Sequence, residues 1–217
     1  LVTADGQSNT VAGTNAGDSF TGTDANNNTL IGYDAGTAIT SGDNNTGTGR
    51  YALKATTTGS NNVALGTDAL ASNTTAGNNT AIGYNTLFSN TTGTTNVAIG
   101  ANALDANTTG FQNVAIGKDA LTDNTTANNN TAVGYAALNE NTTGTENIAV
   151  GKGALSSNTT GDQNIAIGVY TLDANTTADN NTAIGWRSLS DNTTGSQNTA
   201  LGKESLYNNP LQQCLWI

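Results

Sequence analysis

The sequence predicts an all-β fold, a β-solenoid (β-roll or β-helix) of about twelve 17-residue coils. Three observations predict it: a phrase that recurs every 17 residues, an alternation of large and small residues inside that phrase, and a composition unsuited to a layered globular core. Only 35% of the 217 residues are hydrophobic and 5% are aromatic. Stacked coils form a core with fewer apolar residues, because each coil buries its apolar groups against its neighbours.

The repeat opens on an Asn and runs without an insertion. Its consensus is N-[TVI]-A-[ILV]-G-x-x-[AST]-L-x-x-N-T-T-[GA]-x-x, which we number as positions 1 to 17. Degenerate copies carry the same register back to Asn45 and Asn28, and a related phrase at Asn9 is offset by two further residues. The regular copies open at Asn62, Asn79, Asn96, Asn113, Asn130, Asn147, Asn164, Asn181 and Asn198.

This repeat divides the chain into three expected segments. Residues 1–27 form a degenerate N-terminal segment, residues 28–206 form the solenoid, and residues 207–217 form a tail that contains Pro210 and ends in apolar residues. Open solenoid ends expose unpaired strand edges. We therefore expect both terminal segments to act as caps or as assembly joints.

The opening of each unit, as in "NVAIG", alternates like a short strand, with Val or Thr and Ile on one face and Asn, Ala and Gly on the other. We expect one or two short strands per unit, separated by turns whose glycines, at position 5 and in "NTTG", adopt positive φ. The Ile row at position 4 and the Leu row at position 9 are expected to form the core. This core ladder comprises Ile82, Ile99, Ile116, Ile167, Ile184, Leu87, Leu104, Leu121, Leu138, Leu155, Leu172 and Leu189.

Two Asn rows, at positions 1 and 12, are expected to hydrogen-bond along the stack, as amide ladders do in cross-β structures. The second row also opens "NTT", which matches the N-glycosylation pattern, so a glycan acceptor and a turn-forming Asn are both open readings. The stacked Thr residues invite comparison with ice-binding solenoids, but adjacent strand residues face opposite sides and leave one outward Thr row. The candidate glycosylation residues are Asn73, Asn90, Asn107, Asn124, Asn141, Asn158, Asn175 and Asn192.

A second period of 51 residues, three units, lies on top of the first. Tyr33, Tyr84, Tyr135 and Trp186 follow it at position 6. One reading is that a three-unit block was duplicated. The other is that every third coil presents an aromatic side chain to a sugar or to a neighbouring chain, in which case the apolar tail residues Leu215 and Trp216 are further candidates for partner contact.

Composition excludes several kinds of chemistry. The chain has no His and a single Cys, Cys214, so a Ser-His-Asp relay, an imidazole zinc site and an internal disulfide framework are all ruled out. The net charge of −10 opposes binding to nucleic acid, and no apolar run is long enough to insert into a membrane. The scattered carboxylates are expected to be solvated surface charges. We expect no catalytic, cofactor or metal site, and no enzyme activity.

The phrases "NVAIGKDAL", "NIAIGVYTL" and "NTAIGWRSL" resemble the N-x-A-I-G-x-x-A repeats of trimeric autotransporter adhesin heads and of related fibre proteins on bacteria and phages. The resemblance covers about residues 28–206, although the Thr-rich segment makes this unit longer than the usual head coil. It implies a left-handed β-roll, an extracellular or cell-surface location, and a role in adhesion or fibre structure.

Together these features predict a structural protein, the subunit of an extracellular fibre or adhesin shaft that self-assembles through its solenoid ends. The expected partner is the chain itself, as a homopolymer or a homotrimer. The alternatives are a trimeric adhesin head that binds host or matrix surfaces, including glycans, and an ice-binding solenoid.

Overall fold

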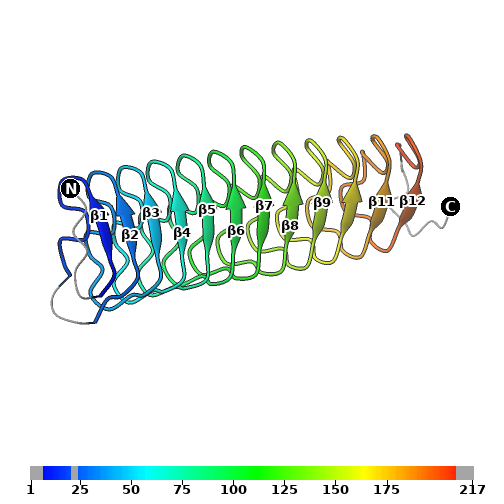
Figure 1. Ribbon diagram of the computed structural model, residues 1–217. Coiled ribbons are helices and arrows are strands. Elements are labelled where there is room, and N and C mark those ends of the chain that lie inside the picture. The colour runs from blue at the N-terminus through cyan, green and yellow to red at the C-terminus, as the bar shows by residue number, and fades with distance from the viewer. Residues whose placement is uncertain (1–6, 21–23, 209–217) are drawn as a thin grey trace.

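The computed structural model describes residues 7–20 and 24–208, and these residues form an all-β solenoid in which each coil contributes one three-residue strand (Figure 1). The predicted fold class is confirmed. The strands are β1 (Thr10–Ala12), β2 (Thr29–Ile31), β3 (Thr46–Thr48), β4 (Val63–Leu65), β5 (Thr80–Ile82), β6 (Val97–Ile99), β7 (Val114–Ile116), β8 (Thr131–Val133), β9 (Ile148–Val150), β10 (Ile165–Ile167), β11 (Thr182–Ile184) and β12 (Thr199–Leu201).

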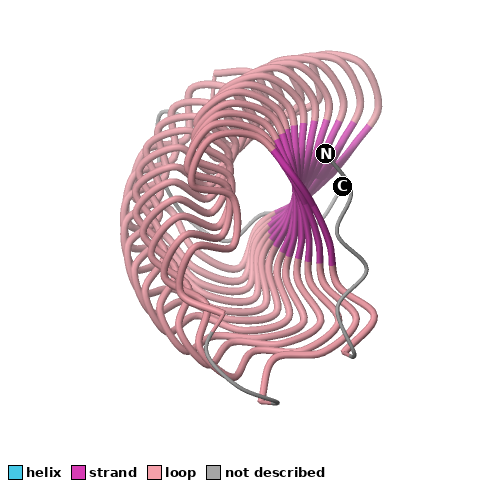
Figure 2. Ribbon diagram, turned by 60° about the vertical axis from the view of Figure 1, so that its left-hand side comes forward, coloured by secondary structure: helices cyan, strands magenta, loops and turns pink. Residues whose placement is uncertain are grey.

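The twelve strands form one parallel sheet in sequence order. Pairing is in register with the repeat, so Val97 lies opposite Val114 and Ile99 opposite Ile116. Seen nearly along the rod, the strands overlap as a twisting fan on one side of the coil, and turns complete the rest of its wall (Figure 2). Because the repeat and the register coincide, each repeat position becomes a continuous row along the rod.

The core consists of alanines and leucines. Ala at position 3 points inward from most strands, Ala at position 8 lies on the facing wall, and both are fully buried in the regular coils. The Leu row at position 9 fills the space between them. Its fully buried members are Leu53, Leu70, Leu87, Leu104, Leu121, Leu138, Leu155, Leu172 and Leu189.

The predicted Ile core was wrong. Ile116, Ile167 and Ile184 are 37%, 38% and 37% exposed, and Ile82 and Ile99 are half-buried. The strand alternation was predicted correctly, but its two faces were assigned the wrong way round. The inner face carries Ala because the Leu of the opposite wall already occupies the narrow interior.

The first two coils show how little space the interior has between positions 3 and 9. In the coil of β2, position 3 is the fully buried Leu30 and position 9 is Gly36 rather than Leu. A Cβ atom added to Gly36 would lie 2.6 Å from a methyl carbon of Leu30. The coil of β1 has the same exchange, with Val11 and Gly17. The large side chain between positions 3 and 9 can therefore come from either wall, and in the coil of β2 Ile39 at position 12 is fully buried as well.

The buried leucines adopt a backbone conformation that is unusual for a bulky residue. From Leu53 to Leu206, all ten members of the row have φ between 50° and 56°. The left-handed region costs an L-residue roughly 1–2 kcal/mol, and full burial of a Leu side chain contributes roughly 1.5–3 kcal/mol. Burial therefore holds each Leu in a turn that glycine would adopt without strain.

Glycine is required at only one of the two predicted corners. Gly100 at position 5 has φ of 131°, and a Cβ there would lie 2.5 Å from the carbonyl oxygen of Gly117 in the next coil. The prediction for the "NTTG" glycines was wrong, because Gly93 and Gly110 at position 15 do not have positive φ. Ala occupies the same position at Ala76 and two later coils, so the position selects a small residue rather than a special backbone angle.

The solenoid begins before the predicted boundary at residue 28. Strand β1 pairs with β2, and the backbone N–H of Asn28 donates to Asn9 Oδ1 at 2.8 Å. At the other end, Leu206 is partly buried against the core. Residues 209–217, which include the candidate contacts Leu215 and Trp216, lie outside the described residues.

Candidate functional site

The two Asn rows belong to the interior of the rod. The backbone N–H of Asn96 donates to Asn79 Oδ1 at 2.9 Å, and Asn107 Nδ2 donates to Asn90 Oδ1 at 2.9 Å. Asn96 Nδ2 and Asn107 Nδ2 also converge on the carbonyl oxygen of Gly110, at 2.9 and 3.1 Å. The predicted amide ladders therefore exist, and the position-15 carbonyl links them within each coil.

This burial removes the candidate glycosylation residues from the surface. Every position-12 Asn, from Asn73 to Asn192, is fully buried. Each Nδ2 atom donates hydrogen bonds inside the rod, as Asn124 Nδ2 does to Asn107 Oδ1 and to the carbonyl of Ala127. A glycan on that nitrogen is incompatible with the folded coil, so the turn-forming reading of these residues is the correct one.

The threonines of "NTT" form two rows of different character. At position 13 the hydroxyl donates to the backbone of the next coil, as Thr108 Oγ1 does to the carbonyl of Thr125 at 3.0 Å. At position 14 the side chains, such as Thr109 and Thr126, are exposed. The exposed side chains at position 14 form the single outward Thr row that the sequence predicts.

Several carboxylates also serve the stack. Asp162 Oδ1 accepts the backbone N–H of Thr145 at 2.6 Å, and Asp179 Oδ1 accepts that of Asp162 at 2.8 Å, so position 16 supplies an acceptor to the preceding coil. Asp43 does the same for Asn26. Among residues 7–20 and 24–208, no group of three or more His, Cys, Asp or Glu side chains is placed to hold a metal ion.

Burial raises the pKa of two aspartates. Burial raises the pKa of Asp105, and the nearby carboxylates Asp123 and Asp119 raise it further. Burial also raises the pKa of Asp173, against a hydrogen bond from Ser190 that lowers it. Both stand at repeat position 10, but they are 68 residues, or four coils, apart, so they do not form a paired acid–base site.

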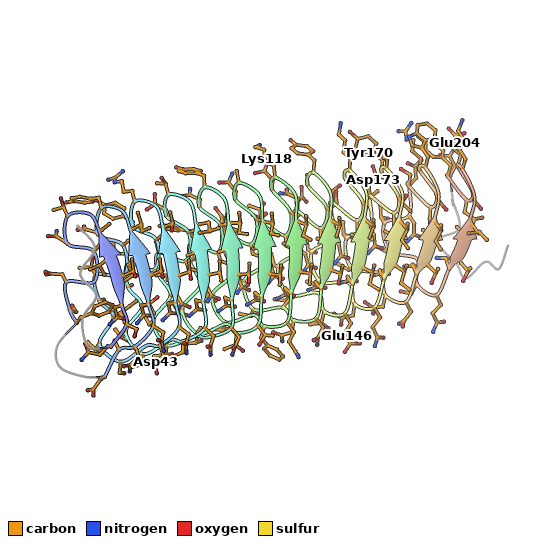
Figure 3. The ribbon with its side chains drawn as sticks, viewed as in Figure 1. Asp43, Lys118, Glu146, Tyr170, Asp173 and Glu204 are labelled. Atoms are coloured by element: carbon orange, nitrogen blue, oxygen red, sulfur yellow. The ribbon has the colours of Figure 1, made fainter. Side chains whose placement is uncertain are left out.

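The aromatic residues form a ridge along one edge of the rod, which we define as positions 6 and 7 of each coil. Tyr33, Tyr84, Tyr135 and Trp186 are 47%, 55%, 50% and 40% exposed. Figure 3 shows Lys118, Tyr170 and Glu204 along this edge, with Asp43 and Glu146 along the opposite one. The predicted aromatic column is therefore on the surface, where it is available for contact.

All six Lys and Arg residues of the chain lie beside these rings. Lys118 and Lys152 flank the Tyr135 ring at 5.5 and 6.0 Å from its centroid. The other cations lie 4.2 to 5.4 Å from a ring centroid: Arg50 and Lys54 beside Tyr51, and Arg187 and Lys203 beside Trp186. Cations over ring faces are attracted by the ring quadrupole, and the cations here occupy faces that a stacked sugar would need.

The surface that the sequence did not reveal is the outer side of the sheet. We call the side chains at positions 2 and 4 of β1–β12 the sheet face. It consists of Thr, Val, Ile, Leu and Ala, and it includes the exposed residues Ile31, Leu65 and Ile148 at 43%, 36% and 39%. The signal in the sequence was Ala at position 3, because a small residue between two large ones fits a narrow interior.

Comparison with known proteins adds no relative to this picture. No family model, no curated protein and no solved structure matches the chain. In the described part of the chain, no helix is long and apolar enough to cross a bilayer. The surfaces above are therefore interpreted from their own geometry.

Proposed function

We propose that the protein is an extracellular structural protein, the subunit of a fibre or adhesin shaft. The observation that supports this most is the uninterrupted stack of twelve in-register strands. Every regular coil is joined to the next by the same backbone bonds and by two buried Asn ladders, as between Asn96 and Asn113. Continuous bonding between neighbouring coils is what a shaft requires.

The extracellular location is supported by the resemblance of the A-I-G phrases to trimeric autotransporter adhesin heads. The net charge of −10 is consistent with a soluble surface protein that avoids nucleic acid and anionic membranes. The side chains that resemble chemical groups of an enzyme, such as Asp162 and Asp179, are engaged in stacking bonds. We therefore propose a mechanical rather than a catalytic role.

Assembly through the solenoid ends is part of this proposal. The edges of a parallel sheet carry N–H and C=O groups that a further strand can pair with. The proposed joints are residues 1–27 and 207–217, of which β1 and Tyr207 belong to the described part of the chain.

A second candidate is a trimeric adhesin head that binds host or matrix surfaces. The exposed aromatic ridge supports it, since Tyr and Trp are enriched where proteins bind partners. In this case the ridge residues Tyr84, Tyr135 and Trp186 would contact the partner. Loss of surface binding on replacing all three with Ser would support the head, and unchanged binding would oppose it.

Electron microscopy of the untreated protein, with mass per unit length, tests the fibre. At a strand spacing of about 4.8 Å, twelve coils extend about 58 Å. One chain per such length is expected for single-file filaments, and three chains for a parallel trimer. Discrete short particles at all concentrations would contradict a filament.

A further inference from the structure

We propose that the sheet face is buried against a second copy of this chain. This inference rests on the proposed function of a self-associating structural rod, and it names the surface through which copies associate side by side. It differs from assembly through the ends, because it uses the length of the rod rather than its terminal coils.

Charge distribution is the first argument. Two outward side chains on each of twelve strands give the sheet face 24 residues, and none of them is charged. The chain nevertheless has 16 acidic and 6 basic residues, and those in the described part lie outside the strands. Charged residues are depleted from the centre of protein interfaces, and large exposed apolar patches mark interaction sites.

The area of the strip formed by the sheet face determines how large an interface it can make. With a strand spacing of about 4.8 Å and a rise of about 3.3 Å per residue, the face measures about 58 by 10 Å, or roughly 600 Å². Two copies face to face therefore bury roughly 1,200 Å², the lower limit for a specific interface. Stable pairing thus needs nearly the full length of the strip.

Shape and side-chain type favour pairing of two such strips. The register runs from β1 to β12 without a bulge, and sheets pack face to face about 10 Å apart. Most residues of the face are β-branched, so they lose little rotamer freedom on burial. A partner must offer an uncharged strip of equal length and repeat, and a second copy of the chain offers one.

The two margins of the sheet face differ in charge. Asp43, Glu146, Asp162 and Asp179 lie at positions 16 and 17 on one margin, whereas the ridge on the other margin carries Arg50, Lys118, Lys152 and Lys203 at position 6. Pairing that sets the acidic margin of one copy beside the ridge of the other is therefore favoured by charge attraction, which salt screens.

Sedimentation equilibrium of the full chain over a range up to about 100 µM tests the proposal. The wild type is expected to reach about 44 kDa, twice its 21.8 kDa mass. The variant Ile116→Lys with Ile167→Lys should weaken association at least about tenfold. The matched control, Thr126→Lys with Thr177→Lys, places the same charges in the same coils on the exposed Thr row and should associate as wild type.

Folding is checked by the thermal midpoint of each variant, and Ile116→Thr with Ile167→Thr provides a β-compatible replacement should the Lys pair unfold. A wild type that stays monomeric at the highest concentration overturns the proposal. So does assembly that survives both face variants. Filaments that form without side-by-side pairing would support the proposed fibre and reject this interface. Pairs that depend on the sheet face but never form filaments would support the interface and contradict the proposed fibre.

Discussion

In the coil that opens at Asn113, two aliphatic side chains of similar size have opposite environments. Leu121 is fully buried, and Ile116 is 37% exposed. The same division holds in every regular coil, with the Leu and Ala rows inside and the Ile, Val and Thr rows outside. Coil width, more than hydrophobicity, therefore decides which residue is buried, because the space between positions 3 and 9 admits one large side chain per coil.

Replacing Leu121 and Ile116 with Ala should give the largest difference in stability between the inner and outer rows. Leu121→Ala is expected to cost about 2–5 kcal/mol, because a fully buried Leu leaves a cavity. Ile116→Ala should cost about 1 kcal/mol or less, since part of its surface is already solvated. Chemical denaturation of both variants measures the difference at a protein concentration low enough to avoid association. Equal losses would mean that the two rows are equally buried.

Moving the large side chain from position 3 to position 9 tests whether the space between these positions admits only one. Gly36→Leu alone should overpack the coil beside Leu30, at a cost of about 1–3 kcal/mol, and Leu30→Ala alone should leave a cavity. The double variant restores the pattern of the regular coils and should recover most of both losses. A double-mutant cycle measures this coupling. Additive losses would show that Leu30 and the position-9 side chain do not share one space.

The interior also contains a polar region, the Asn ladders, which the outer rows lack. Asn107→Ala removes the donor to Asn90 Oδ1 and the acceptor of Asn124 Nδ2. Leaving buried polar groups unpaired should cost about 1–3 kcal/mol for each group. Thr109→Ala, in the same coil on the exposed Thr row, should change the thermal midpoint very little. A loss for Thr109→Ala as large as that for Asn107→Ala would argue against a buried ladder.

The smallest expected effect concerns the carboxylate of Asp105, which follows the buried Leu104. Burial raises the pKa of Asp105 in the folded protein, so its contribution favours folding below the unfolded pKa and is lost as pH rises through the folded pKa. Asp105→Asn should therefore stabilise the protein slightly at neutral pH, within about 0.5 kcal/mol, and lose this advantage in acid. Thermal midpoints at both pH values measure it. An advantage that grows in acid would have the wrong sign.

Much of the fold was predictable because the repeat is regular. The 17-residue period, the stacking and the Asn ladders follow from residues that recur at fixed spacing, as at Asn79 and Asn96. The Leu row was also predictable. The orientation of the strand was not, since "NVAIG" gives the same alternation whichever face is inside, and the deciding fact, the Leu side chain filling the interior from the opposite wall, is a matter of three-dimensional width.

The surface was harder to predict for the same reason. Asn73 and its equivalents match a glycosylation pattern that says nothing about burial, and the outward Ile row was expected inside. The clustering of Lys118 and Lys152 around Tyr135 depends on which positions are neighbours in successive turns. The 17-residue spacing predicts which residues share a row, but it does not predict which side chains touch one another.

The chemical accessibility of the two rows tests most directly that the Leu row lies inside the rod and the Ile row outside. In a Cys214→Ser background, Ile116→Cys and Leu121→Cys report the outer and inner positions of one coil through their rates of thiol labelling. We expect rapid labelling of Ile116→Cys in dilute solution, slowing as concentration rises, and protection of Leu121→Cys at every concentration. Equal protection of both cysteines in dilute solution would contradict it.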